Sequence, residues 1–414
     1  MLLKTETSLK LKAMPKFDLC IIGGGPAGMM AAIASSERKK KVVLIEKNDD
    51  LGSKLLLTGG GRCNITHAGL TKKEFVSKFG KQGDFLLSSL SLFGVEELIE
   101  FFKKRGLLLT IEGEKVYPKT ESSKEVLNFF KTELRKNKVT VLTNSEVKDF
   151  LFKDKKIEKV LLSSGEEVFA DNFLIATGGK SYPSTGSTGD GYAFVKKMGH
   201  KIAELKPALT PIETKEKWVV ALKGLTLHNV GIKLNNEKPI LGEVLFTHFG
   251  ISGPTILNLS ERVESKDKIH IDLFPKKNIE ELEEEIIALF ESNFKKTINN
   301  ILSEVVPFKL LSIILNFSDI KKEEICRNIT KEQRKKLLKN LKGIELNVIG
   351  LLGFDKAMVT KGGIFLKEID AKNMKSKLVN NLYFAGEVID LNGESGGYNL
   401  QMSFTTGYTV AQNI

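Results

Sequence analysis

The 414-residue sequence has little cysteine and no long apolar run. It contains three cysteines, Cys20, Cys63 and Cys326. This number is too small for a disulfide-stabilised scaffold and favours a reducing, cytoplasmic location. The longest uncharged apolar stretch, 19–34, is short and interrupted by glycine and proline, so it is not expected to span a membrane. Residues 1–16 lack the continuous apolar segment of a secretory signal.

The composition permits a large core and an anionic partner. With 41% hydrophobic residues in 414, the chain is expected to form two or three domains. The formal net charge of +12 suits a partner such as RNA, although a lysine-rich, solvated surface explains it equally well. The segment 321–342 has nine basic residues against three acidic ones and predicts a broken helix or helix pair with a basic face.

Residues 16–48 predict a dinucleotide-binding unit. An apolar run leads into Gly23, Gly25 and Gly28, an alanine-rich helix follows, and a second apolar run ends before Glu46. The first glycine permits a tight turn, the second a close approach of pyrophosphate, and the third close packing of helix on strand. The helix N-terminus favours phosphate, and a carboxylate such as that of Glu46 binds ribose hydroxyls. This pattern alone does not separate NAD from FAD.

Two later stretches favour FAD. Residues 171–200 run from an apolar strand through Gly178 and Gly179 into a helix, and 380–414 repeat this order through Gly386 and Glu387. A helix starting near Tyr398 would direct its positive N-terminal end at the pyrimidine edge of a flavin. The alternative is that the glycines before this helix form an ordinary turn.

The loop "LLLTGGGRCNITH", 55–67, is expected to cradle the cofactor. Its three glycines let the backbone approach a ligand without Cβ clashes. Arg62 would face the pyrophosphate or a substrate anion, and Asn64 would bond the ring edge. Val147, just past a strand, is placed to meet adenine.

Four motifs carry a family resemblance. "GSKLLLTGGGRCNIT", "ATGGKSYPSTGSTGDGYAFVKKMGH", "GEVLFTHFGISGPTIL" and "AGEVIDLNGESGGYNLQMSFTTG" together resemble the BaiN/RdsA-type family of bacterial FAD-dependent flavoproteins. The likeness runs from about residue 16 to the end. It implies an α/β fold in which a Rossmann-type FAD-binding domain is interrupted by a β-barrel-like part and a small helical subdomain. The family includes aminoacetone oxidases, a bile-acid-reducing branch and enzymes that reduce a uridine of ribosomal RNA.

The motifs and the resemblance together imply a set of FAD contacts. They are Gly23, Gly25, Pro26, Ala27, Gly28, Glu46, Lys47, Lys54, Gly60, Gly61, Arg62, Asn64, Val147, Thr177, Gly178, Gly179, Gly386, Glu387, Gly397, Tyr398, Asn399 and Leu400. No metal site is predicted.

The predicted organisation has one interrupted domain. From about residue 200 the pattern changes to short strands and then to helices. We expect an FAD-binding domain from 16–196 and 343–414, a β-rich insert over 197–278, and a basic helical subdomain over 279–342. Residues 1–15 are expected to form a flexible N-terminal tail.

Two residues are candidates for proton transfer. Cys63 could donate a proton to a base held over the flavin, and the imidazole of His248 could serve as acid or base. Each has a structural alternative: Cys63 as a small residue that fills space under the cofactor, and His248 as a loop histidine bonded to backbone.

The predicted function is FAD-dependent oxidoreduction. No second G-x-G-x-x-G occurs, so NADH would visit the open flavin face and leave before the substrate enters. The preferred hypothesis is reduction of a ribosomal RNA uridine to dihydrouridine, with RNA contacted through 321–342. The alternatives are a small-molecule flavoenzyme, such as an amine oxidase or enoyl reductase, and a non-catalytic flavin-binding protein.

Overall fold

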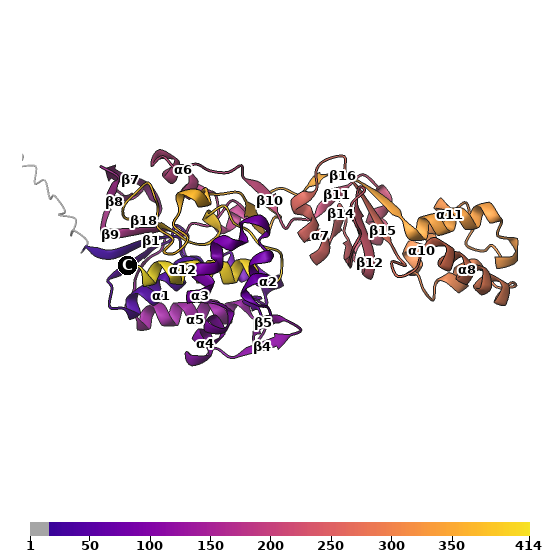
Figure 1. Ribbon diagram of the computed structural model, residues 1–414, viewed down its shortest axis with the longest axis horizontal. Helices are drawn as coiled ribbons and strands as arrows, with labels where there is room; N and C mark the ends of the chain where they lie inside the picture. The colour runs from indigo at the N-terminus through magenta and orange to yellow at the C-terminus, as the bar shows by residue number, and fades with distance from the viewer. Residues whose placement is uncertain (1–15) are drawn as a thin grey trace, which may run out of the picture. The chain divides into compact units, whose positions relative to one another are not determined.

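The computed structural model describes residues 16–414, and the predicted tail, 1–15, lies outside the described residues. The chain divides into two compact units (Figure 1). Unit 1 comprises 16–206 and Val359–Ile414, and unit 2 comprises Pro207–Met358. The predicted α/β class, with a Rossmann-type sheet and a barrel, is confirmed.

Unit 1 is built on a seven-stranded sheet. Its strands are β1 (Phe17–Ile22), β2 (Val42–Ile45), β6 (Thr140–Leu142), β7 (Val147–Lys153), β8 (Lys156–Leu162), β9 (Glu167–Ile175) and β18 (Leu382–Phe384). Their order is β6-β2-β1-β9-β8-β7, and β18 also pairs with β9. The pairs β2–β6, β1–β2, β1–β9 and β9–β18 are parallel, whereas β7, β8 and β9 form an antiparallel meander. Every residue of β2 is buried, as expected for a strand covered on both faces.

Helices and a small sheet complete unit 1. The helices are α1 (Pro26–Glu37), α2 (Lys72–Ser77), α3 (Leu87–Leu92), α4 (Val95–Lys104), α5 (Ser123–Lys136), α6 (Asp190–Lys197) and α12 (Tyr398–Gln412). The antiparallel strands are β3 (Thr66–His67), β4 (Leu109–Glu112) and β5 (Lys115–Pro118), in the order β3-β5-β4. The last helix, α12, packs directly against α1. A Cβ added at Gly407 would stand only 2.2 Å from the carbonyl oxygen of Ala27, so glycine permits this close contact. The polypeptide therefore returns to its first strand–helix unit.

Unit 2 contains a closed barrel. Its strands are β11 (Ile212–Thr214), β12 (Thr226–Leu234), β13 (Ile240–Phe246), β14 (Gly250–Ser252), β15 (Lys268–Asp272) and β16 (Ile344–Leu351), in the closed order β11-β14-β13-β12-β15-β16. The chain leaves unit 1 at β10 (Lys206–Ala208) and re-enters it at β17 (Val359–Lys361).

The domain boundaries differ from those expected. The sequence pattern predicts that the FAD domain resumes at residue 343, but β16 closes the barrel by pairing with β11 and β15. At the other boundary, 197–206 remains in unit 1. There the Ala203 N–H donates to the carbonyl oxygen of Gly363 at 2.8 Å. Both boundaries are therefore determined by backbone hydrogen bonds between segments that lie more than a hundred residues apart in the sequence.

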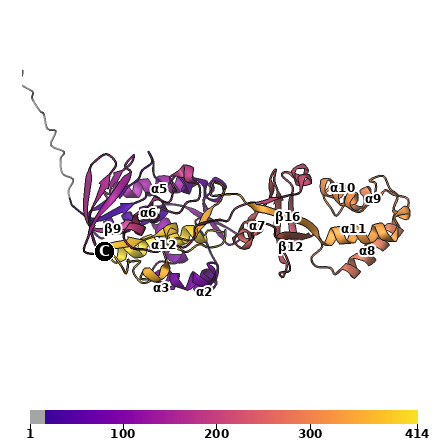
Figure 2. The same ribbon diagram turned by 90° about the horizontal axis from the view of Figure 1, so that it is seen from above.

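The helices of unit 2 are α7 (Pro254–Leu259), α8 (Ile279–Ser292), α9 (Ile298–Leu302), α10 (Phe308–Phe317) and α11 (Lys331–Lys342). The last four gather beside the barrel (Figure 2) and share one core with it. Within the basic segment 321–342, a short turn over Cys326–Asn328 precedes α11, which begins at a capping box of Thr330 and Gln333. Among the residues that the structure describes, no helix has both the length and the apolar character needed to cross a bilayer.

Candidate cofactor site

The turn between β1 and α1 has the geometry that its glycines predict. Gly23 has φ +110°, and a Cβ there would stand 2.4 Å from the carbonyl oxygen of Ala176 at the end of β9. A Cβ at Gly28 would stand 2.0 Å from the carbonyl oxygen of Gly23, whereas one at Gly25 meets nothing within 4 Å. Helix α1 begins at Pro26, so its first N–H groups lack intrahelical partners. The turn is closed on the protein side and open at the helix N-terminus, where an anion binds best.

Glu46 lies beside this turn. Its carboxylate accepts hydrogen bonds from the N–H groups of Gly24 at 2.8 Å and Asn48 at 3.0 Å, and the residue is buried. The carboxylate therefore holds the end of β2 against the glycine turn. The neighbouring Lys47 is directed to α6, where it pairs with Asp190.

The loop after β2, residues 55–64, forms the second wall. Gly59, Gly60 and Gly61 all have positive φ, and a Cβ at Gly60 or Gly61 meets nothing within 4 Å. Cys63 also has positive φ, at +61°, and its side chain is fully buried. The following Asn64 is buried, and its Oδ1 has no hydrogen-bond partner within residues 16–414. The loop thus combines an open glycine edge with an unused acceptor.

Arg62 is engaged differently from the prediction. Its guanidinium pairs with Glu112 and Glu121, the latter at 2.8 Å, and lies over the ring of Tyr117 at 4.2 Å from the centroid. Two carboxylates already neutralise this cation, so the structure does not leave it free for a pyrophosphate or a substrate anion.

A largely buried ion pair joins the loop to the later strands. Lys54 Nζ lies 2.7 Å from Glu387 Oε2, and the side chains are 21% and 15% exposed. Glu387 Oε1 accepts from Ser181 Oγ and from the Thr360 N–H, both at 2.8 Å. Thr360 Oγ1 in turn accepts from the Ser181 N–H at 3.1 Å, and a Cβ at Gly179 would stand 2.3 Å from this oxygen. Four chain segments therefore meet at Glu387.

The N-terminus of α12 closes the cradle. Helix α12 begins at Tyr398, as predicted. Gly397 has φ +99°, and a Cβ there would stand 2.7 Å from the Thr66 backbone of β3. The ring of Tyr398 is buried and stacks on His67 with centroids 4.9 Å apart. The glycine is needed because the helix end touches the small sheet.

The remaining predicted contacts have mainly structural partners. The Asn399 amide holds the preceding turn, accepting from the Gly393 N–H at 2.8 Å and donating to its carbonyl oxygen at 2.7 Å. Leu400 packs partly buried against the core, and Gly386, with φ +76°, donates its N–H to a threonine of α12. Val147 is buried as the first residue of β7.

The unpaired polar atoms of the site fit a flavin nucleotide. Three buried side-chain atoms on its walls have no hydrogen-bond partner among the described residues: Asn64 Oδ1, Thr177 Oγ1 and His67 Nδ1. Thr177 precedes Gly178, which has φ +73°. Buried polar groups are normally paired, so these atoms are available to a polar ligand. His67 is the last residue of the quoted loop 55–67 but was not among the predicted contacts; its Nε2 lies 3.0 Å from Glu114 Oε2.

The two proton-transfer candidates differ in environment. Burial raises the pKa of Cys63 to about 12, against a weaker opposite effect of a hydrogen bond with Thr58. Its place in the core favours the space-filling alternative. His248 is exposed in the turn between β13 and β14 of unit 2, where its ring contacts Phe249 with centroids 4.7 Å apart.

A Rossmann-type sheet with a glycine turn, an acidic β2 end and a C-terminal helix aimed back at the cradle defines the class of FAD-dependent oxidoreductases. Residues 17–413 match the family described as HI0933-like protein Rossmann domain. The chain belongs to this family, and the resemblance predicted from its motifs is confirmed.

The similarity to known proteins extends over nearly the whole chain. A ribosomal RNA dihydrouridine synthase of Haemophilus influenzae is 31% identical over 95% of this chain and 97% of its own length. A 3-dehydro-bile acid delta(4,6)-reductase of Clostridium scindens is 30% identical over 87% and 90%. A 3-ketosteroid-delta4-(5alpha)-dehydrogenase of Rhodococcus jostii shares the fold, with a TM-score of 0.51 at 12% identity over 98% of this chain and 99% of that chain.

Proposed function

We propose that this chain reduces a uridine of ribosomal RNA to dihydrouridine, with FAD as the bound cofactor and NADH as the electron donor. The observation that carries the proposal is the likeness to a ribosomal RNA dihydrouridine synthase along almost the full length of both chains. A second protein of that name, from Escherichia coli, is 27% identical over 97% of this chain. The net charge of +12 suits a polyanionic substrate.

The cradle residues supply binding and orientation. When bound, FAD would accept hydride from NADH and pass it to one carbon of the uracil double bond. The open N-terminus of α1 at Gly25 would hold the pyrophosphate, and Glu46 the ribose. Asn64 and Thr177 offer their unpaired oxygens to the cofactor's donors. The N-terminus of α12 would stabilise negative charge on the ring that faces it.

The other carbon of the uracil double bond needs a proton. Cys63 and His248 are the proposed sources, and each is tested by one substitution. Cys63→Ala removes the thiol from a buried position, and His248→Gln removes the ring from an exposed one. The donor is the residue whose loss slows reoxidation of reduced FAD by substrate but leaves reduction by NADH unchanged.

A small-molecule reductase is the second candidate. The likeness to a 3-dehydro-bile acid delta(4,6)-reductase favours it, because that protein is about as similar as the first relative. Saturation of an enone and of a uracil both place a hydride and a proton across a polarised carbon–carbon double bond.

One experiment separates the two candidates. The purified protein is reduced anaerobically with NADH, the bleaching of the flavin absorbance is recorded, and ribosomal RNA or a steroid enone is added. Reoxidation by RNA, with two hydrogens gained by one uridine in mass spectrometry, supports the proposal. Reoxidation by the enone alone refutes it, and a colourless protein that takes up no FAD refutes both candidates.

A further inference from the structure

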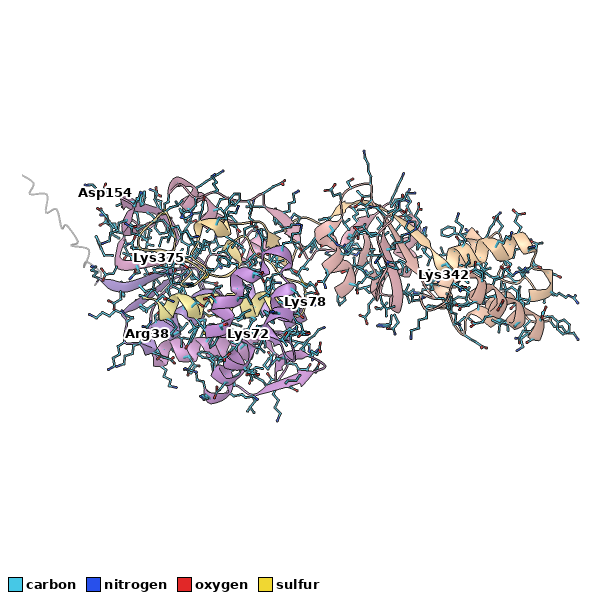
Figure 3. All side chains as sticks on the ribbon, viewed as in Figure 1. Arg38, Lys72, Lys78, Asp154, Lys342 and Lys375 are labelled. Carbon is cyan, nitrogen blue, oxygen red and sulfur yellow. The ribbon has the colours of Figure 1, made fainter. Side chains whose placement is uncertain are left out.

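The basic segment predicted to contact RNA is partly neutralised by its own neighbours. On α11, Arg334 pairs with Glu283 at 3.2 Å and Lys336 with Asp319 at 2.8 Å. Lys342, labelled in Figure 3, pairs with Asp272 at 2.7 Å. Cations that are already paired release fewer counterions from an RNA, so these three contribute little to its binding.

The six cations between α8 and α11, over residues 293–330, are exposed and lack an ion pair among residues 16–414. They are Lys295, Lys296, Lys309, Lys321, Lys322 and Arg327. Four carboxylates lie in the same stretch, Glu304, Asp319, Glu323 and Glu324; Asp319 pairs with Lys336 at 2.8 Å, and Glu324 accepts from the side-chain amide of Asn328 at 3.0 Å. The set keeps a clear positive excess.

Backbone pairing brings most of these cations together. The segment after α8 runs antiparallel to the segment before α11, with a bridge between Thr297 and Ile325. The Cys326 N–H donates to the Lys296 carbonyl oxygen at 3.1 Å, and the Ile298 N–H donates to that of Glu324 at 2.9 Å. Residues 295–296 therefore lie beside 324–327.

Two exposed phenylalanines belong to the same surface. Phe294 is 48% and Phe308 is 56% exposed. Lys295 Nζ lies 5.5 Å from the centre of the Phe294 ring, and Lys322 Nζ lies 5.7 Å from that of Phe308. Each ring is therefore exposed to solvent beside an ammonium group that has no ion pair among residues 16–414, although aromatic rings are normally buried.

We propose that this aromatic–basic edge, made of Phe294, Lys295, Lys296, Phe308, Lys309, Lys321, Lys322 and Arg327, binds an unpaired segment of the RNA substrate. The inference rests on the proposed function and locates its macromolecular contact. Exposed aromatic rings stack unpaired bases, and neighbouring cations bind the phosphates between those bases.

An anionic membrane is the competing partner for exposed rings and lysines. A membrane-binding helix presents a continuous apolar face. Here the apolar face of α10, which includes Leu310, Leu311 and Ile314, is buried in the core of unit 2. The exposed rings of Phe294 and Phe308 each lie beside a lysine, which matches separate bases on a charged backbone.

The test measures binding of a labelled single-stranded fragment of ribosomal RNA to the FAD-loaded protein. The aromatic variant is Phe294→Ala/Phe308→Ala, with Phe152→Ala as its control, since Phe152 of unit 1 is 40% exposed. The charge variant is Lys295→Gln/Lys322→Gln/Arg327→Gln. Its control removes three exposed cations of α11, Lys331, Lys335 and Lys339, which have no ion pair among the described residues.

The aromatic variant is expected to bind roughly 10-fold more weakly for each ring removed. The charge variant is expected to flatten the dependence of log affinity on log salt by about 0.7 for each phosphate that it no longer neutralises. Both controls are expected to bind like the unmodified protein. Emission of Trp218, which packs against Phe317 of α10, checks that each variant of unit 2 is folded.

The outcomes separate this inference from the proposed function. If the unmodified protein forms dihydrouridine but the edge variants bind RNA as well as it does, the edge proposal is overturned and the function stands. Equal losses in the α11 control overturn it too. Binding to anionic vesicles and not to RNA overturns the edge proposal, and absence of dihydrouridine with any RNA overturns the function.

Discussion

Glu387 is expected to hold unit 1 together as well as to border the cofactor site. Glu387→Gln keeps the shape of the side chain but replaces a charged oxygen that faces Lys54 at 2.7 Å. Losing one member of a buried pair costs about 3–5 kcal/mol, and a charge-assisted hydrogen bond about 1.5–3 kcal/mol. Since both side chains keep some contact with water, we expect a decrease of about 2 kcal/mol in the free energy of unfolding of unit 1.

The aromatic residues allow the two units to be followed separately in urea. The single tryptophan, Trp218, lies in unit 2. All tyrosines lie in unit 1: Tyr117, Tyr182, Tyr192, Tyr383, Tyr398 and Tyr408. Tyrosine absorbance should therefore show the earlier transition of the variant, while Trp218 emission stays unchanged. FAD is kept at one concentration, because a ligand of the folded state adds to stability.

A matched control is Glu100→Gln. Glu100 pairs with Lys104 at 2.7 Å on α4, but the two side chains are 61% and 69% exposed. Such a pair contributes about 0.3–0.5 kcal/mol. The reasoning is refuted if Glu387→Gln changes the tyrosine transition no more than the control does, or if it moves the Trp218 transition equally.

Three further predictions use other features. Gly28→Ala should lower the free energy of unfolding of unit 1 by about 1–3 kcal/mol, since its Cβ would stand 2.0 Å from the Gly23 carbonyl oxygen, and the variant should not retain FAD in gel filtration. Gly25→Ala, whose Cβ meets nothing within 4 Å, should stay folded and only bind FAD more weakly. The three cysteines are buried, and burial raises the pKa of Cys63 to about 12. A thiol reagent at pH 8 should therefore react with none of them until the protein is denatured. Fast reaction of the native protein would contradict this burial. Burial lowers the pKa of His200 below its usual 6.5, so protonation favours the unfolded state and stability should fall as the pH drops below about 6.5 through the lower folded pKa. His200→Asn should remove this part of the pH dependence in acid titrations followed by tyrosine absorbance, and an unchanged profile would assign it to other groups.

Local patterns predicted the elements that depend on neighbouring residues. The glycines at 23, 25 and 28 mark the turn by their spacing in the sequence, and a Cβ at Gly28 would meet Gly23, although the atom that a Cβ at Gly23 would meet, the Ala176 carbonyl oxygen, lies far along the chain. The start of α12 near Tyr398 was also predicted, from the glycine-rich turn before it. Such features can be predicted because the residues that mark them are close together in the sequence.

Features that depend on distant partners could not be predicted. Arg62 is paired with Glu112 and Glu121, and nothing in the loop motif announces these carboxylates. His67 Nδ1 has no hydrogen-bond partner in the part of the chain that the structure describes, and its ring stacks on Tyr398, which lies more than 300 residues away in the sequence. The cations of 321–342 likewise look equivalent in sequence, and only their packing separates paired from free ones.

The discontinuity of unit 1 has a consequence for its biosynthesis. Unit 2 is one continuous stretch, Pro207–Met358. In unit 1, β9 pairs with β18 and α1 packs against α12, and both β18 and α12 are translated after unit 2. A nascent chain can therefore complete the barrel while the apolar faces of β9 and α1 are still uncovered. Ribosome-bound intermediates of this protein should bind chaperones through the N-terminal half until the last fifty or so residues emerge.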